Sequence, residues 1–390
     1  MDMMIYLDNS ATTKPFPEVV DAFATVASHY FANPSSLHGL GMKAERLLKQ
    51  AREQIAAMLD VKPSEIVFTS GGTEANNFAI KGVAWQYRRR GRHIITTEIE
   101  HPSVAEPCRQ LEELGFEVTY LPVGPDGRVS AEQVARALRD DTILVSVMHV
   151  NNEVGAVQPI EEIGAVLARH PKTLFHVDRV QGIGKVPLDV KRCGIDLFTV
   201  SAHKFHGLRG AGLLYVRDGV RLTPLIAGGG QERQLRSGTE NVAAIVAMAK
   251  ALRLALERYE RDIGRLRELK AEWLQALAAI PSLSINTAER GSAPHIINFS
   301  LPSGIKPEVF VHELEKSEIY VSTTSACSSK RRAPSKTLLA MGVGEGRAER
   351  GIRISLSFDN RREEIKPAVA AIQQAIKTLS EVTGSHGDEV

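Results

Sequence analysis

The sequence predicts an α/β protein in which a large domain with a mostly parallel sheet is joined to a smaller α+β domain. Between about residue 45 and residue 235, short apolar runs alternate with stretches of helical periodicity, the pattern of a sheet covered by helices. A long helical stripe follows, and shorter strand-like and helix-like segments come after it. The length of 390 residues also exceeds the usual size of one hydrophobic core, so two domains are expected.

The strands of the large domain are predicted from short apolar runs. These runs cover residues 65–70, 93–97, 117–121, 142–149, 174–178, 197–201 and 212–215. Helix-like stretches lie between several of them, at residues 73–90, 103–114, 130–139 and 159–169. Because strands and helices alternate, we expect most neighbouring strands to run parallel.

The small domain begins with a long helix. Between Leu252 and Leu277 apolar residues recur at three- and four-residue steps with one seven-residue gap, and charged residues fill the other positions. Strands are then expected at residues 295–301, 320–323 and 351–357, and helices at residues 306–315, 335–341 and 365–379. The predicted large domain is residues 16–255. The predicted small domain is residues 1–15 and 256–390, and it carries a loop at about residues 322–334.

The composition is that of a soluble globular protein. The 48 lysine and arginine residues against 46 aspartate and glutamate residues give a net charge of +2. This charge argues neither for nor against a polyanionic partner. The first eight residues contain no basic region followed by an apolar run, so no signal peptide is expected. No run of about 18 apolar residues predicts a membrane span. The three cysteines are too few for a disulfide framework and indicate a reducing, cytoplasmic environment.

A glycine-containing turn follows the first predicted strand and opens a helix. Gly72 lets backbone N–H groups approach a phosphate, the helix dipole favours an anion there, and Thr73 adds a hydroxyl donor. The alternative is a plain turn with Thr73 as the helix N-cap. His101 follows the next strand, at the sheet edge where α/β proteins bind ligands, although a lone histidine is also compatible with simple packing.

An acid ends the strand at residues 174–178. Strand alternation puts Asp178 and Val180 on one face and Arg179 on the other, with Gln181 reaching the rim of the same ligand. A buried acid needs a cationic partner, such as the protonated nitrogen of a pyridine ring. A salt bridge at the end of the strand is the alternative.

Two nucleophiles complete the pattern. Lys204 follows an apolar strand and lies between Ser201 and His203 on one side and several glycines on the other. Desolvation or nearby cations would lower the pKa of such a lysine and free its amine to attack an aldehyde. Cys327 lies among small polar residues with three cations following within five positions, which favours the thiolate. With Asp178, these residues predict pyridoxal phosphate chemistry on a sulfur substrate.

These motifs closely resemble the cysteine desulfurases, a family within the class V aminotransferases that has the fold type I architecture of pyridoxal phosphate enzymes. The similarity runs in order along almost the whole chain. It covers residues 6–13, 33–38, 70–74, 101–104, 150–155, 201–204, 236–239 and 325–327.

The resemblance implies a role for each site residue. Lys204 would bind pyridoxal 5′-phosphate covalently, and His101 would stack on its ring and help to move protons. The remaining cofactor-binding residues would be Gly72, Thr73, Asn152, Asp178, Gln181, Ser201, His203 and, from the second subunit of a homodimer, Thr239. Asn152 and Arg353 would contact the substrate, with the guanidinium clamping its carboxylate. Asn151 is the alternative to Asn152. No metal site is expected.

The implied reaction removes sulfur from L-cysteine and leaves L-alanine. The catalytic residues would be Lys204, His101 and Cys327, which would carry the sulfur as a persulfide. The sulfur would then pass to an acceptor protein, either an iron–sulfur scaffold or a tRNA-thiolation enzyme. The resemblance fails at residue 179, which is commonly small in this family and is Arg179 here. Because alternation directs this side chain away from the ring, we expect it at the surface, with no part in catalysis.

Other functions fit parts of the pattern. A class V aminotransferase shares Lys204 and Asp178 but does not need Cys327, and a selenocysteine lyase is chemically adjacent. A non-catalytic sulfur-transfer scaffold would tolerate loss of Lys204 or Asp178, and both are present. The basic run at residues 88–92 allows RNA binding, but the solvated end of a helix explains it equally, so no nucleic-acid partner is expected.

Overall fold

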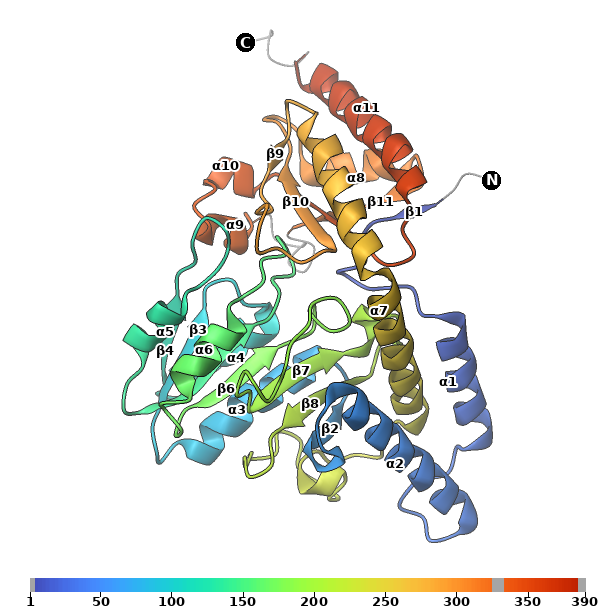
Figure 1. Cartoon of the computed structure of the whole chain (residues 1–390), viewed down its shortest axis with the longest axis vertical. Helices are drawn as coiled ribbons and strands as arrows, with labels where there is room; N and C mark the ends of the chain where they lie inside the picture. The colour runs from blue at the N-terminus through green and yellow to red at the C-terminus, as the bar shows by residue number, and fades with distance from the viewer. Residues whose placement is uncertain (1–3, 325–332, 385–390) are drawn as a thin grey trace.

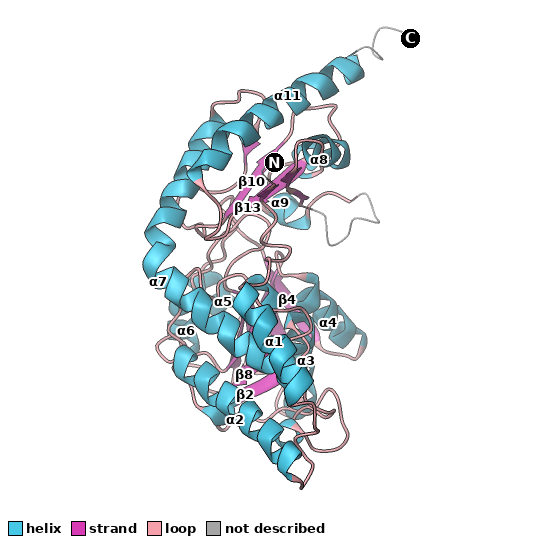
Figure 2. Ribbon diagram, turned by 90° about the vertical axis from the view of Figure 1, so that its right-hand side faces the viewer, coloured by secondary structure: helices cyan, strands magenta, loops and turns pink. Residues whose placement is uncertain are grey.

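The computed structural model describes residues 4–324 and 333–384. Within them a large α/β unit and a smaller α+β unit are joined by the 37-residue helix α7 (Val242–Ala278), which runs along both (Figures 1 and 2). The helix begins where the side chain of Asn241 accepts a hydrogen bond from the Ala244 N–H. It therefore starts ten residues before the apolar stripe that predicted it, because its first turns are rich in alanine and packed in the large core.

The large sheet has seven strands in the described part of the chain, and their order is β2-β8-β7-β6-β5-β3-β4. The strands are β2 (Ile66–Thr69), β3 (His93–Thr97), β4 (Glu117–Leu121), β5 (Thr142–Met148), β6 (Leu174–Asp178), β7 (Leu197–Ser201) and β8 (Gly212–Val216). The block from β7 to β4 is parallel, and β8 runs antiparallel to both β7 and β2. The predicted mostly parallel sheet is confirmed.

Helices cover both faces of this sheet. The four that the sequence predicts are α3 (Gly72–Tyr87), α4 (Pro102–Glu113), α5 (Ala131–Ala137) and α6 (Ile160–Leu167). Two more, α1 (Pro17–His29) and α2 (Gly39–Leu59), were not predicted; they lie against the first half of α7 (Figure 1). Their apolar stripes are narrow, and several large apolar residues on them and in the loop between them are exposed, which weakens the periodic signal.

The small unit is built on an antiparallel sheet of order β12-β13-β10-β9. Its strands are β9 (Ser284–Ile285), β10 (Ile296–Ser300), β12 (Ser322–Thr323) and β13 (Gly351–Ser355), and its helices are α8 (Pro307–Glu315), α9 (Lys336–Ala340), α10 (Glu345–Ala348) and α11 (Ile365–Gly384). The strand predicted at residues 320–323 is two strands. Its first part, β11 (Ile319–Tyr320), pairs in parallel with β1 (Ile5–Tyr6), so the N-terminus joins the small unit.

Separate hydrophobic cores stabilise the two units. The faces of the large sheet bury alternate residues, with Phe175 and Val177 in one cluster and Leu174 in the other. The small core surrounds Trp273, which is fully buried. Helix α7 contributes to the large core up to Ala255 and to the small core from Leu266. The predicted domain boundaries stay a prediction. No helix in the described residues has the length and hydropathy to cross a membrane.

Candidate active site

A cavity of about 350 Å³ opens at the carboxyl ends of β5, β6 and β7, where ligands bind in parallel α/β sheets. The small unit closes one side of it through Arg353 of β13. Ten of the predicted site residues line this cavity: Gly72, Thr73, His101, Asn152, Asp178, Gln181, Ser201, His203, Lys204 and Arg353. Of these ten, the two farthest apart in the chain, Gly72 and Arg353, are 281 positions apart and meet at one site.

One end of the cavity is formed by the glycine turn before α3. Gly71 has a φ of +153°, and a Cβ on Gly72 would lie 3.0 Å from a methyl carbon of Val180 and 3.4 Å from Ser201 Cβ. A side chain at Gly72 would crowd Val180 and Ser201, so glycine is favoured where α3 approaches β7 closely. The first turn of α3 and the side chains of Thr73 and Ser201 supply donors there, as a phosphate site needs.

Asp178 is the last residue of β6, and its carboxylate is buried. Oδ2 accepts a hydrogen bond from Asn76 Nδ2 at 2.8 Å, and Oδ1 accepts one from the Val180 N–H at 2.9 Å. Both partners are neutral, so the negative charge is oriented but not neutralised by them. Asp178, Val180 and Gln181 line the cavity, which is the facing that strand alternation predicts.

Arg179 is not a surface residue, and that expectation is wrong. Its side chain is absent from the described lining of the cavity, as alternation predicts, but only 7% of the residue is exposed. Its guanidinium lies 5.8 Å from the ring centroid of Phe198, and its Nε has no hydrogen-bond partner among the described residues. Burial lowers the pKa of Arg179 to about 10. The sheet is covered on both faces, so pointing away from the ligand means pointing into a core.

His101 is the N-cap of α4 and is held in a fixed orientation. Its Nδ1 accepts a hydrogen bond from the Ser103 N–H at 3.1 Å and lies 2.7 Å from Ser103 Oγ. Burial lowers the pKa of this imidazole, and the charge of Lys204 lowers it further against the opposing effect of Asp178. His101 is therefore an uncharged ring at neutral pH, suited to lie against an aromatic ligand.

Lys204 ends the short 3₁₀ turn η2 (Ala202–Lys204) directly after β7. Its Nζ donates hydrogen bonds to the backbone carbonyls of Ser10 at 2.6 Å and Ala11 at 2.9 Å. Gln181 donates to the same Ser10 carbonyl at 2.9 Å. Burial, and then the charge of Lys204, lowers the pKa of His203 to about 4, so this ring is neutral as well. The N-terminal segment thus supports both Lys204 and Gln181.

Arg353 enters the cavity from the middle of β13. Its guanidinium donates to the Asn152 carbonyl at 2.9 Å and forms a 2.8 Å ion pair with Asp8. The cavity is lined by Asn152 and not by Asn151. The Asn151 side chain instead accepts from the Glu153 and Val154 N–H groups and donates to the Ile99 carbonyl, so it shapes the loop.

The sequence interpretation missed several residues of the site. Ser10, Ala11, Asn76, Ser103 and Met148 also line the cavity. Asn76 lies one helical turn after Gly72, a spacing that puts it on the same side of α3 and that sequence periodicity would have indicated. Asp8, which pairs with Arg353, carries no signal of its own, because its partner is 345 residues away.

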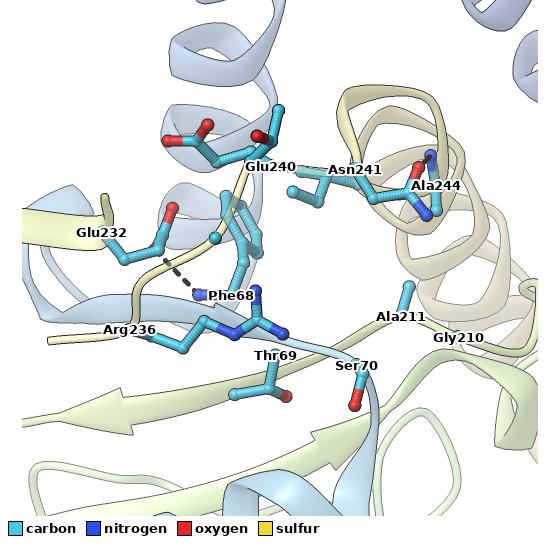
Figure 3. A pocket seen from close by; sticks show the side chains of 13 residues that line it. Phe68, Thr69, Ser70, Gly210, Ala211, Glu232, Arg236, Glu240, Asn241 and Ala244 are labelled. Atoms are coloured by element: carbon cyan, nitrogen blue, oxygen red, sulfur yellow. Dashed lines mark hydrogen bonds between the residues drawn. The ribbon is translucent and has the colours of Figure 1, made fainter. Parts of the chain in front are cut away.

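Thr239 lies elsewhere. It lines a second cavity of about 200 Å³ beside the loop before α7, with Ser70, Arg236 and Asn241. Figure 3 shows that Phe68, Thr69 and Ser70 line one side of this cavity and that Glu240, Asn241 and Ala244 line another. An ion pair of 2.8 Å between Arg236 and Glu74 links its loop to α3. The structure does not bring Thr239 into the cavity that Lys204 lines in the same chain.

The predicted sulfur nucleophile, Cys327, lies outside the described residues. The other two cysteines are buried, and burial raises the pKa of both thiols, Cys108 in α4 and Cys193 before β7. Neither of them lines a cavity described above. Among the described residues, no group of three or more histidine, cysteine, aspartate and glutamate side chains could hold a metal ion.

The lining fits the pyridoxal phosphate that the resemblance implies. The space above Gly72 would be filled by any side chain, and polar donors surround it. The buried Asp178 carboxylate is oriented by neutral partners and lines the cavity, as the acceptor of a ring N–H would. Ser10 Oγ and Asn76 Oδ1 are buried without a hydrogen-bond partner in the described structure, so polar groups remain to be satisfied at this site.

The chain is similar to known proteins along most of its length. The aminotransferase class-V family model matches residues 5–367. A protein of Lactobacillus delbrueckii subsp. bulgaricus, named "NifS/IcsS protein homolog", is 48% identical over 381 residues, covering 97% of this chain and 99% of that protein. "Cysteine desulfurase IscS" of Dictyoglomus turgidum is 41% identical, covering 98% and 97%. A solved structure named "NIFS-LIKE PROTEIN" is 39% identical with a TM-score of 0.89, covering 97% and 100%.

Proposed function

The chain belongs to the aminotransferase class-V family and is a cysteine desulfurase, and we propose that it uses pyridoxal 5′-phosphate to convert L-cysteine to L-alanine. The observation that carries this proposal is the meeting of Lys204, Asp178 and Arg353 in one cavity. An amine, a ring-facing acid and a carboxylate-binding cation are together the groups that an amino-acid substrate and this cofactor require.

The residues of the cavity would hold the cofactor from three sides. The turn at Gly72 and Thr73, with Ser201 and His203, would bind the phosphate, and Lys204 would attach to the aldehyde. Asp178, fixed by Asn76, would accept the ring N–H, while Gln181 would meet the ring hydroxyl. Bound in this way, the cofactor supplies an electron sink for bond breaking at the substrate Cα.

The protein groups would divide the remaining work. Arg353 would clamp the substrate carboxylate, with Asp8 and the Asn152 carbonyl holding the guanidinium in place. The freed Lys204 amine would take the Cα proton, and the neutral ring of His101 would cover the cofactor and help to transfer protons. The carbonyls of Ser10 and Ala11 hold the Lys204 amine where both tasks are within reach.

Cys327 would accept the sulfur. Its thiolate would attack the substrate sulfur, so that the C–S bond of cysteine breaks and an S–S bond forms. The electron pair of the C–S bond would stay with the substrate carbon, which would take up a proton to become the methyl group of L-alanine, and the enzyme would be left with a persulfide. This role rests on the sequence motif, in which Cys327 is followed closely by three cations that favour the thiolate. The persulfide would pass to an acceptor protein, an iron–sulfur scaffold or a tRNA-thiolation enzyme.

We also propose a homodimer whose cofactor sites borrow Thr239 from the partner subunit. Thr239 lines a cavity other than that of Lys204, which supports a role for it in another copy of the chain.

A cytoplasmic location is also proposed. It is supported by two cysteines that are free and buried in the described residues.

The proposal is tested with purified enzyme loaded with pyridoxal phosphate. Borohydride reduction should fix the cofactor on Lys204, as located by peptide mapping. The enzyme should then release L-alanine from L-cysteine in amounts equal to the sulfur delivered to a thiol acceptor. Transfer of the amino group to a 2-oxo acid at a comparable rate would instead indicate an aminotransferase. Turnover of L-selenocysteine with no turnover of L-cysteine would indicate a selenocysteine lyase.

A further inference from the structure

Lys185 is a buried lysine that lies directly behind Lys204. It follows β6 by seven residues, in the turn that begins at Arg179, and only 5% of it is exposed. Its Nζ donates a hydrogen bond to the backbone carbonyl of Lys204 at 2.8 Å. Lys185 is not among the described residues that line the Lys204 cavity. It therefore contacts Lys204 through the protein interior and not through the ligand.

This arrangement buries the Lys185 amine against the backbone of Lys204. Burial, and after it the charge of Lys204, lowers the pKa of Lys185 to about 7. The other titratable groups that feel its charge are His206, whose pKa burial lowers to about 4, and His295, whose pKa burial also lowers. Both rings are neutral near pH 7. Lys185 forms no salt bridge with an acid in the described structure, so no paired carboxylate offsets its charge when it is protonated.

We propose that Lys185 is a positioning residue for Lys204, which fixes the turn that carries Lys204 and opposes protonation of the Lys204 nitrogen through its own positive charge. This inference rests on the proposed role of Lys204 in holding the cofactor. A nearby like charge disfavours a second proton most strongly where water is excluded. A second cation is also an established means of keeping a lysine amine nucleophilic. The Lys204 amine, once released from the cofactor, is then ready to accept the Cα proton.

The test is a spectrophotometric pH titration of the cofactor-loaded enzyme, because the absorbance of the cofactor attached to Lys204 reports protonation of that nitrogen. Lys185→Met preserves the length of the side chain but removes its charge. In this variant the pH midpoint for protonation of the Lys204 nitrogen should rise by about one pH unit. Lys185→Arg keeps the charge and a donor, so its midpoint should stay near that of the parent. Because Lys185 titrates in the same range, the parent curve should be broader than a one-proton curve, and the Met variant should narrow it.

Lys270→Met is the matched control. Lys270 is also buried, and burial lowers its pKa to about 8, but its amine donates to Ser292 and to the Ala293 carbonyl and not to the Lys204 turn. The midpoint of the cofactor titration in Lys270→Met should equal that of the parent enzyme. If Lys185→Met does not fold, Lys185→Gln, which retains a donor without the charge, replaces it and should show the same rise.

The outcomes separate the two proposals. Met and Gln variants that titrate like the parent, or an Arg variant displaced as far as the Met variant, would overturn the role of Lys185 while leaving the cofactor on Lys204. Borohydride reduction that fixes the cofactor on another lysine would overturn the proposed function itself, whatever the titrations show.

Discussion

Asn76 donates a hydrogen bond from its side-chain amide to Oδ2 of Asp178 at 2.8 Å, and the same amide donates to Ser103 Oγ at 2.8 Å. One residue of α3 thus connects the acid that ends β6 to the helix that follows His101. The amide is buried, so it has no alternative partner in water. Asp178 is therefore held in its orientation before any ligand arrives.

Replacing Asn76 should weaken cofactor binding. In Asn76→Ala the carboxylate of Asp178 loses a hydrogen bond of the charged class, and we expect an approximately tenfold loss of affinity for pyridoxal phosphate. Fluorescence titration of the cofactor-free protein measures it. Gln374→Ala, an exposed amide on α11 that donates to Thr378, is the control and should bind like the parent. Equal affinities for parent and Asn76→Ala would mean that Asp178 needs no such support.

Arg179 should matter for stability and not for cofactor binding. Arg179→Ala removes a buried stem that packs near Phe198, so the free energy of unfolding should fall by about 2 kcal/mol. Arg179→Met keeps much of that volume without burying a charge, so its stability should equal or exceed that of the parent. Urea unfolding measures both. Loss of the cofactor absorbance in the Met variant would contradict the facing of β6.

Cys327→Ala should separate substrate binding from sulfur transfer. The cavity that would hold the cofactor and Arg353 is complete without the thiol, so L-cysteine should still change the cofactor spectrum. Persulfide and catalytic L-alanine should not form. Cys108→Ala and Cys193→Ala are controls, because both thiols are buried and should leave turnover in place. Alanine release at the parent rate from Cys327→Ala would remove this cysteine from the mechanism.

Exchange of subunits tests where Thr239 acts. Lys204→Ala and Thr239→Ala homodimers should each be defective, the first in chemistry and the second in cofactor retention. Mixing the two by unfolding and refolding should give heterodimers in which one site has both residues intact. About half of the parent activity per heterodimer is expected if Thr239 serves the partner. No recovery in purified heterodimers would show that Thr239 acts in its own chain, and full activity of the Thr239→Ala homodimer would show that it has no part in the site.

Stability should fall with acid because of a histidine in the large sheet. His176 lies on β6 between Ser146 Oγ and Thr199 Oγ1, and burial lowers its pKa from 6.5 to about 3. At His176 the unfolded chain therefore binds one more proton than the folded chain between pH 6.5 and pH 3. The contribution of this residue to the free energy of unfolding is lost as pH falls through that range. In His176→Gln the slope of the free energy of unfolding against pH should decrease by about 1.4 kcal/mol per pH unit in this range. An unchanged slope in urea unfolding at several pH values would show that His176 is protonated in the folded state.

Sequence patterns predicted the large sheet well and the periphery poorly. Strands such as β6 and β7 are continuous apolar runs buried on both faces, and no other local structure suits them in that context. The two-residue strands β1 and β9 exist only through pairing with other segments, so they are too short to carry a periodic signal. The helices α1 and α2 were missed for a related reason, since their main contacts are with α7.

The candidate site shows the same limit. Residues that follow a strand directly, such as Asp178 and Lys204, are predictable because parallel strands deliver their ends to one edge. The burial of Arg179 and the position of Lys185 depend on what covers the other face of the sheet. The pairing of Asp8 with Arg353 depends on the path of the whole chain.

The ion pair between Asp8 and Arg353 has a consequence for how the protein is made. Its two residues are separated by 345 positions, and Ser10 and Ala11, which hold the Lys204 amine, adjoin Asp8. A ribosome must therefore translate the 345 positions after Asp8 before the guanidinium exists that fixes this N-terminal segment. The nascent chain carries its lysine long before it can seat a substrate carboxylate. With the role proposed for Arg353, sulfur chemistry would begin only in chains that extend past this residue.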